Sequence, residues 1–124
     1  MSPNKQIYIT GPSGQLGKCL RLKLSLLNIK TIILSRKSPN LYPNENHITY
    51  KLGDEIQITK NSNHVYFFHF AYEPYDRNES VKNINYIGLR KIIKNINMIK
   101  KKSFIYISTV NCNDNSTNYN RQKN

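Results

Sequence analysis

A chain of 124 residues and 14.5 kDa has room for one compact domain and excludes a second domain of ordinary size. A formal charge of +12 raises nucleic acid or an anionic membrane surface as a partner, but the lysines are spread over nearly every segment, so neither is expected. Cys19 and Cys112 fit no disulfide framework or zinc ribbon, and the histidines lack ligand spacing, so no metal site is expected. Without a signal peptide or a run of about 20 apolar residues, the chain is expected to be soluble and cytoplasmic.

The first third of the chain predicts a strand, a helix and a second strand. Residues 5–10, KQIYIT, are β-branched and aromatic and stop at a glycine-rich turn, which is typical of a strand. Leucines then recur at helical spacing and predict an amphipathic helix of about three turns, with Arg21 among the basic residues that point away from its apolar face. These leucines are Leu16, Leu20, Leu24 and Leu27. A second strand is predicted at residues 31–35.

The rest of the chain continues the alternation. A weaker strand is predicted around residues 47–52, and the continuous apolar run VYFFHF at 65–70 predicts a strand covered on both faces, the best candidate for the centre of a sheet. A long helix between 80 and 99 and a strand at 104–107 follow. This order predicts an α/β fold with a parallel sheet flanked by helices. Residues 111–124 are nearly devoid of apolar side chains and are expected to be mobile.

The glycine-rich turn is the most informative segment. Gly11, Gly14 and Gly17 repeat as Gly-x-x-Gly-x-x-Gly between the first strand and the first helix. Missing side chains at such a turn let backbone amides approach a pyrophosphate at the positive end of the helix. No Gly-Lys-Ser/Thr follows, so the turn is not a Walker loop. The predicted cofactor contacts here are Thr10, Gly11, Ser13, Gly14, Gln15, Leu16 and Gly17.

Read together with Thr10, this turn resembles the Thr-Gly-x-x-Gly-x-x-Gly signature of the extended short-chain dehydrogenases/reductases, the family of NAD-dependent epimerases, dehydratases and reductases. Further motifs resemble those of the family in the same chain order: Gly53-Asp54, His69-Phe70-Ala71, Asn85 with Gly88, and FIYIST at 104–109. The resemblance implies a single Rossmann domain over residues 1–124. It also implies that Asp54 lies near adenine and that His69, Ala71 and Asn85 contact the cofactor.

The same resemblance covers the catalytic groups. Tyr119 and Lys123 form a Tyr-x-x-x-Lys pair one loop after Ser108-Thr109, and on a helix that spacing places both on one face. In the family, the tyrosine exchanges a proton with the substrate, and the lysine lowers the tyrosine pKa and holds the nicotinamide ribose. The resemblance implies that Thr109 or Ser108 hydrogen-bonds the reacting oxygen. A phenol with a pKa near 10 is a poor base without such a neighbouring cation.

The residue that follows the second strand indicates the choice between NAD and NADP. An acidic residue there binds the ribose of NAD, whereas a basic residue accepts the phosphate of NADP. Ser35-Arg36-Lys37 contains no acid, so NADP is favoured, with Arg36 as its ligand; NAD stays open, because Arg36 and Lys37 could be ordinary surface bases. We therefore expect a nicotinamide dinucleotide and a small-molecule substrate as partners, and leave a homodimer open.

The family's later strands and its substrate region follow the Tyr-x-x-x-Lys helix, whereas this sequence ends one residue after Lys123. We therefore expect the N-terminal part of an NAD(P)-dependent oxidoreductase, epimerase or dehydratase acting on a carbonyl or hydroxyl substrate such as a nucleotide sugar. By this expectation the chain is truncated after the fifth strand and inactive without a partner. The alternatives are a non-catalytic NAD(P)-binding module, a degenerate family member, or nucleic-acid binding through the positive charge.

Overall fold

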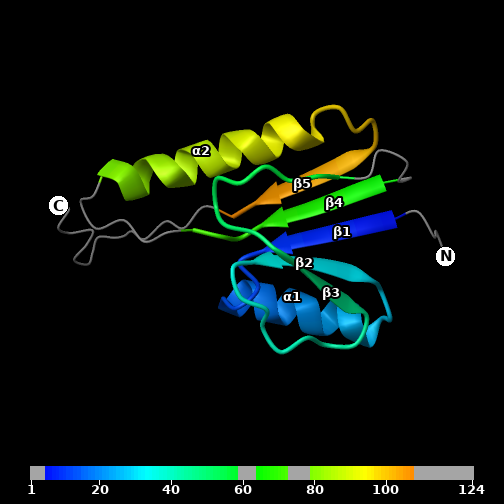
Figure 1. Ribbon diagram of the computed structural model, residues 1–124. Helices are drawn as coiled ribbons and strands as arrows, with labels where there is room; N and C mark the ends of the chain where they lie inside the picture. Colours follow the sequence, from blue (N-terminus) through cyan, green and yellow to red (C-terminus); the bar gives the residue numbers. More distant parts are fainter. Residues whose placement is uncertain (1–4, 59–63, 73–78, 108–124) are drawn as a thin grey trace.

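The computed structural model describes residues 5–58, 64–72 and 79–107, and within them the order of strands and helices is the predicted one (Figure 1). The elements are β1 (Lys5–Thr10), α1 (Gln15–Leu26), β2 (Thr31–Ser35), β3 (Glu45–Thr49), β4 (His64–His69), α2 (Glu79–Ile96) and β5 (Lys102–Tyr106). No helix within these described ranges combines the length and the apolar character that a membrane crossing requires.

The strands form one five-stranded parallel sheet in the order β3-β2-β1-β4-β5. The centre of this sheet is β1, so the prediction that the apolar run at 65–70 is the central strand is wrong. That run forms β4, an inner strand between β1 and β5. An inner strand and the central strand are both covered on two faces, so their sequences look alike. They differ only in strand order, because the chain adds strands on both sides of β1.

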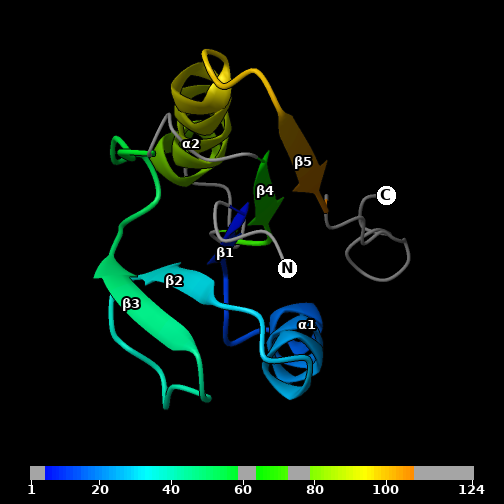
Figure 2. The same cartoon turned by 90° about the vertical axis from the view of Figure 1, so that its right-hand side faces the viewer.

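The two helices cover opposite faces of the sheet (Figure 2). Alternation along β1 supplies both cores, because successive side chains of a strand point to opposite faces. On the α1 face the buried residues are Ile7, Ile9, Leu24 and Ile33. On the α2 face the buried residues are Tyr8, Leu34, Tyr50, Ile56, Val65, Phe67, Ile92, Ile96 and Ile99.

Two strands and both helices depart in detail from the prediction. β3 begins at Glu45 and ends at Thr49, earlier than the expected 47–52, and Leu52 packs against the α2-face core instead of pairing in the sheet. β5 begins at Lys102, because pairing depends on the backbone and a lysine can pair as well as an apolar residue. α2 ends at Ile96, before the expected end at 99, and its Ile87 and Ile93 are exposed.

The apolar face predicted for α1 is displaced around the helix. Leu16 and Leu27 are exposed, whereas Arg21, expected to point outward, is only 2% exposed. The buried residues of α1 are Gly17, Arg21 and Leu24, at i, i+4 and i+7. The sheet-facing side of α1 therefore carries a charged residue in place of a leucine.

Candidate functional site

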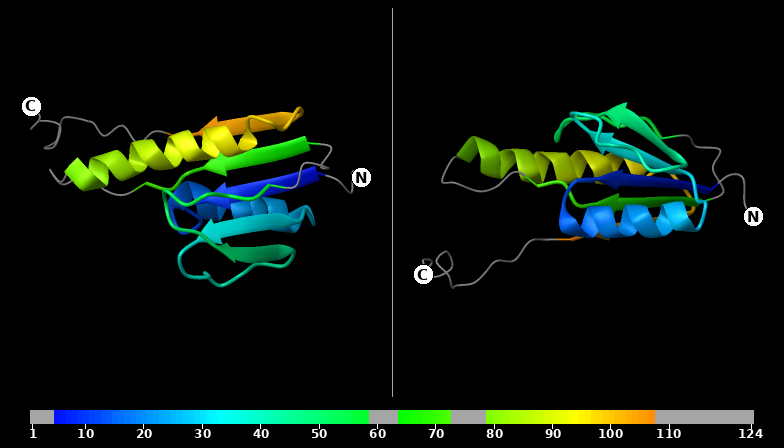
Figure 3. Two further views of the ribbon diagram at one scale, coloured as in Figure 1. Left: turned by 45° about the horizontal axis from the view of Figure 1, so that its top comes forward. Right: turned by 90° about the horizontal axis from the view of Figure 1, so that it is seen from below.

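The carboxyl ends of β1, β2 and β4 meet at one edge of the sheet, since all the strand arrows point the same way (Figure 3). Thr10, the last residue of β1, is in register with Leu34 on one side and with His69 on the other. From β1 the chain first builds β2 and β3 on one side, and then crosses back to build β4 and β5 on the other side. Ligands of open parallel sheets bind at such a reversal of strand order.

The buried hydroxyl of Thr10 joins the ends of β1 and β4. Its Oγ1 accepts hydrogen bonds from the backbone amides of Phe70 and Ala71, both at 3.0 Å, and lies 2.7 Å from Nδ1 of His69. A hydroxyl has two lone pairs and one proton, so after accepting twice it donates to Nδ1. The hydroxyl therefore has no free donor or acceptor for a ligand. Its hydrogen bonds fix the positions of His69 and Ala71.

The same geometry sets the protonation state of His69. Nδ1 accepts a hydrogen bond from the Thr10 hydroxyl, so the ring is neutral and carries its proton on Nε2. Burial lowers the pKa of His69 from 6.5 to about 4, because the charged ring would lose its hydration. The ring is 1% exposed and stacks on Tyr106, with the centroids 5.6 Å apart. His69 is thus a neutral part of the core beneath the edge.

A pH-dependent stability follows from this buried histidine. Between pH 6.5 and about 4 the unfolded chain binds a proton at His69 that the folded chain does not, so stability is lost as the pH falls through this range. We expect the free energy of unfolding to fall by roughly 3 kcal/mol from this group alone. Denaturant unfolding of the protein and of His69→Gln at pH 7 and pH 4 measures the effect. Equal pH dependence in both proteins would contradict it.

Two of the three glycines of the turn are required by the packing of the chain itself. Gly11 has φ +67°, and a Cβ there would lie 2.6 Å from the carbonyl carbon of Phe70 and 2.7 Å from the amide nitrogen of Ala71. A Cβ on Gly17 would collide with the carbonyl oxygen of Gly11. These two glycines let the turn approach the end of β4 and let α1 approach the turn.

Gly14 differs from both. It is exposed, and among residues 5–58, 64–72 and 79–107 the nearest atom to a Cβ placed there is the carbonyl oxygen of Gly11, at an uncrowded 3.8 Å. Gly14 is the N-cap of α1, where no side chain caps the helix and no acid stands in the first turn. The first amides of a helix have no intrahelical acceptor and carry the positive end of its dipole. The space beside Gly14 is therefore suited to an anion.

The other residues predicted around this edge lie in two places, near the start of α1 and directly after β2. Ser13, Gln15 and Leu16 are exposed at the start of α1, and Leu16 is 55% exposed although it is apolar. Arg36 is exposed directly after β2. Beside it, the Ser35 hydroxyl donates to the carbonyl oxygen of Lys37 at 2.7 Å.

Asp54 and Asn85 belong to a second contact region, where the chain after β3 meets α2. The carboxylate of Asp54 accepts a hydrogen bond from the backbone amide of Lys51 at 2.8 Å and so closes a turn. Gly88 allows the close approach of α2, because a Cβ there would lie 2.5 Å from a methyl carbon of Leu52. Asn85 lies less than one helical turn before Gly88. The predicted catalytic residues Ser108, Thr109, Tyr119 and Lys123 lie outside the described residues.

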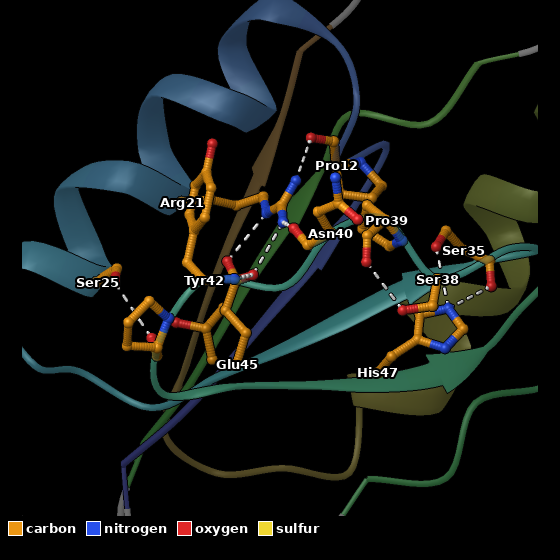
Figure 4. Close-up of polar contacts among 12 residues, drawn as sticks. Pro12, Arg21, Ser25, Ser35, Ser38, Pro39, Asn40, Tyr42, Glu45 and His47 are labelled. Atoms are coloured by element: carbon orange, nitrogen blue, oxygen red, sulfur yellow. Dashed lines mark hydrogen bonds and ion pairs between the residues drawn. The ribbon is translucent and has the colours of Figure 1, made fainter.

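Sequence reasoning missed a buried ion pair beside the turn. Arg21 of α1 and Glu45 of β3 form two hydrogen bonds of 2.9 Å each, and their side chains are 3% and 2% exposed (Figure 4). The guanidinium also donates to the carbonyl oxygen of Pro12 at 3.1 Å. The sequence held one signal for the burial of Arg21, because its spacing places it on the same helix face as Gly17 and Leu24.

Solved structures with the same arrangement include UDP-galactose 4-epimerase, with 20% identity, a TM-score of 0.65, and coverage of 84% of this chain and 38% of that one. The chain has a Rossmann fold. Uronate dehydrogenase from Agrobacterium tumefaciens shares this Rossmann fold at 19% identity and a TM-score of 0.63, over 85% of this chain and 41% of that one. UDP-N-acetylglucosamine 4-epimerase from Bacillus cereus matches at 20% identity and a TM-score of 0.62, over 90% of this chain and 42% of that one.

A further structure with this Rossmann fold is a variant of the same uronate dehydrogenase in complex with NAD, at 20% identity and a TM-score of 0.61. The chain spans between 38% and 42% of the length of these enzymes. The sequence matches no protein-family model and no curated protein. The likeness predicted from the motifs is thus confirmed for the fold.

Proposed function

We propose that this Rossmann domain binds a nicotinamide dinucleotide, with its pyrophosphate beside Gly14 and the first amides of α1. The observation that carries the proposal is the difference among the three glycines. The chain needs the missing side chains of Gly11 and Gly17 for its own packing, whereas no described residue crowds Gly14 or caps the helix there with a side chain. A glycine without an internal packing reason, at the reversal of strand order, is suited to close approach by a phosphate.

We also infer that the domain belongs to an extended short-chain dehydrogenase. The ordered motifs and the Rossmann fold support this together. The activity proposed is that of an NAD(P)-dependent oxidoreductase, epimerase or dehydratase acting on a carbonyl or hydroxyl group, for example in a nucleotide sugar. Tyr119 would exchange the proton, Lys123 would lower the pKa of Tyr119, and Thr109 or Ser108 would hold the reacting oxygen. The bound dinucleotide would supply the hydride chemistry.

NADP is the proposed form of the cofactor. Arg36 is exposed directly after β2, and Ser35 stands at the end of that strand without a carboxylate that would repel a phosphate. Asp54 is proposed to lie near the adenine, and Asn85 and Ala71 are proposed to contact the cofactor. The predicted contact of His69 is not proposed for its side chain, because that side chain is buried beneath the edge.

The dinucleotide proposal is tested by measuring affinities for NADPH and NADH through their fluorescence. We expect the full chain to bind both, NADPH about tenfold more tightly, because a guanidinium pairs strongly with a phosphate. Arg36→Ala should remove most of this preference and leave the NADH affinity unchanged. Lys30→Ala is the matched control, since Lys30 is also exposed but precedes β2 at the opposite end of the strand.

Two results would count against these proposals. Retention of neither dinucleotide would refute the binding proposal itself. An equal loss of NADPH affinity in Arg36→Ala and Lys30→Ala would refute the assignment of Arg36, because only a general charge effect would then remain.

A further inference from the structure

The ion pair between Arg21 and Glu45 lies almost out of solvent, at 2% and 9% exposure of the two residues. Buried ion pairs contribute little to stability compared with apolar residues of similar size, because both charges lose their hydration. The hydrogen bond with Glu45 is the largest cause of a raised Arg21 pKa, so the guanidinium remains charged. A gain in stability therefore does not explain an arginine at this position. The explanation lies in the acceptors of the N–H groups that Glu45 does not engage.

Those remaining donors reach two separate loops. Nη1 donates to the carbonyl oxygen of Pro12, within the glycine-rich turn, and Nη2 donates to the carbonyl oxygen of Asn40 at 2.9 Å. The guanidinium also lies over the ring of Tyr42, 4.6 Å from its centroid. A planar group with five N–H donors can serve all these partners at once, whereas a lysine cannot.

Pro12 is held from a second side by Gly17, since a Cβ on Gly17 would come within 3.1 Å of the Cα of Pro12. Gly17 and Arg21 are one helical turn apart on the buried face of α1. The helix thus positions the turn by a close backbone approach and by a hydrogen bond. The loop that contains Asn40 and Tyr42 leads from β2 into β3, and Glu45 accepts a hydrogen bond from the amide of Tyr42 at 2.8 Å.

We propose that Arg21 is a positioning residue of the dinucleotide site, which holds the glycine-rich turn and the loop after β2 in one fixed relation while Glu45 holds Arg21. This inference rests on the proposed function, because the turn would bind the pyrophosphate and the loop begins beside Arg36. Figure 4 shows Arg21 reaching from α1 to both segments. Small errors in such positions weaken ligand binding strongly.

The test replaces the pair with apolar residues in the full chain, as Arg21→Met with Glu45→Leu. The exchange removes two buried charges, which offsets the loss of the bonds to Pro12, Asn40 and Tyr42, so we expect a thermal midpoint within about 5 °C of the unaltered protein. Affinity should nevertheless fall about tenfold, and similarly for NADPH and NADH, because both contain the pyrophosphate. The matched control is Leu24→Ala, a buried α1 residue of the core that should lower the midpoint and keep the affinity within about twofold.

Each result bears on the inference. Unchanged affinity in the apolar exchange, or an equal loss in Leu24→Ala, would overturn it and leave dinucleotide binding intact. If the exchange does not fold, Arg21→Lys keeps the charge pair without the two carbonyl contacts, and it too should bind about tenfold more weakly. Normal binding by Arg21→Lys would overturn the inference. Failure of the unaltered protein to bind either dinucleotide would refute both proposals together.

Discussion

Replacing Gly11 with alanine is expected to lower the free energy of unfolding by roughly 4 kcal/mol. The backbone there has φ +67°, a conformation that alanine rarely adopts. The added methyl group would also lie 2.6 Å from the carbonyl carbon of Phe70, which is a backbone atom and cannot rotate away as a side chain could. Relief requires the turn to move off the end of β4. Denaturant unfolding followed by circular dichroism measures the loss.

Gly14→Ala is the matched control, because it makes the same chemical change three residues later. At Gly14 the backbone has φ −72°, and a Cβ meets no atom of the described part of the chain closer than 3.8 Å. We expect it to change stability by about 1 kcal/mol or less, the difference between glycine and alanine at an N-cap. Its effect should fall on dinucleotide affinity, since the methyl group occupies the space proposed for the pyrophosphate. Equal destabilisation by the two substitutions would contradict this division of roles.

Thr10→Val should also destabilise the protein, by roughly 3–4 kcal/mol. Valine keeps the shape of threonine but removes the oxygen that receives the amides of Phe70 and Ala71 and donates to His69. The amide of Phe70 retains a longer contact of 3.3 Å to the backbone oxygen of Thr10, whereas that of Ala71 loses its partner. Unpaired polar groups in buried surroundings account for the loss.

Thr10→Ser distinguishes the hydroxyl from the methyl group. Serine keeps all three hydrogen bonds and should cost about 1 kcal/mol for the missing methyl group. Thermal and denaturant unfolding of both variants measure the difference. A valine variant as stable as the serine variant would show that the three hydrogen bonds to Thr10 contribute nothing to the joint between β1 and β4.

Much of the candidate site was predictable because its signals are local. The spacing of Gly11, Gly14 and Gly17 after a β-branched strand predicts a turn that opens a helix, and that prediction needs only neighbouring residues. Distinguishing the roles of these glycines was not possible from the sequence. Gly11 is required by Phe70, far along the chain, while Gly14 faces open space.

The order of elements, the parallel α/β class and the position of the turn were predictable, because the local period of apolar residues and the glycine spacing encode them. The central place of β1, the burial of Arg21 and the full engagement of the Thr10 hydroxyl became visible in the folded chain alone. Thr10 and His69 are 59 positions apart, and Arg21 and Glu45 are 24 apart. Such partners meet only when strands pair and helices dock, and no local pattern of residues records that meeting.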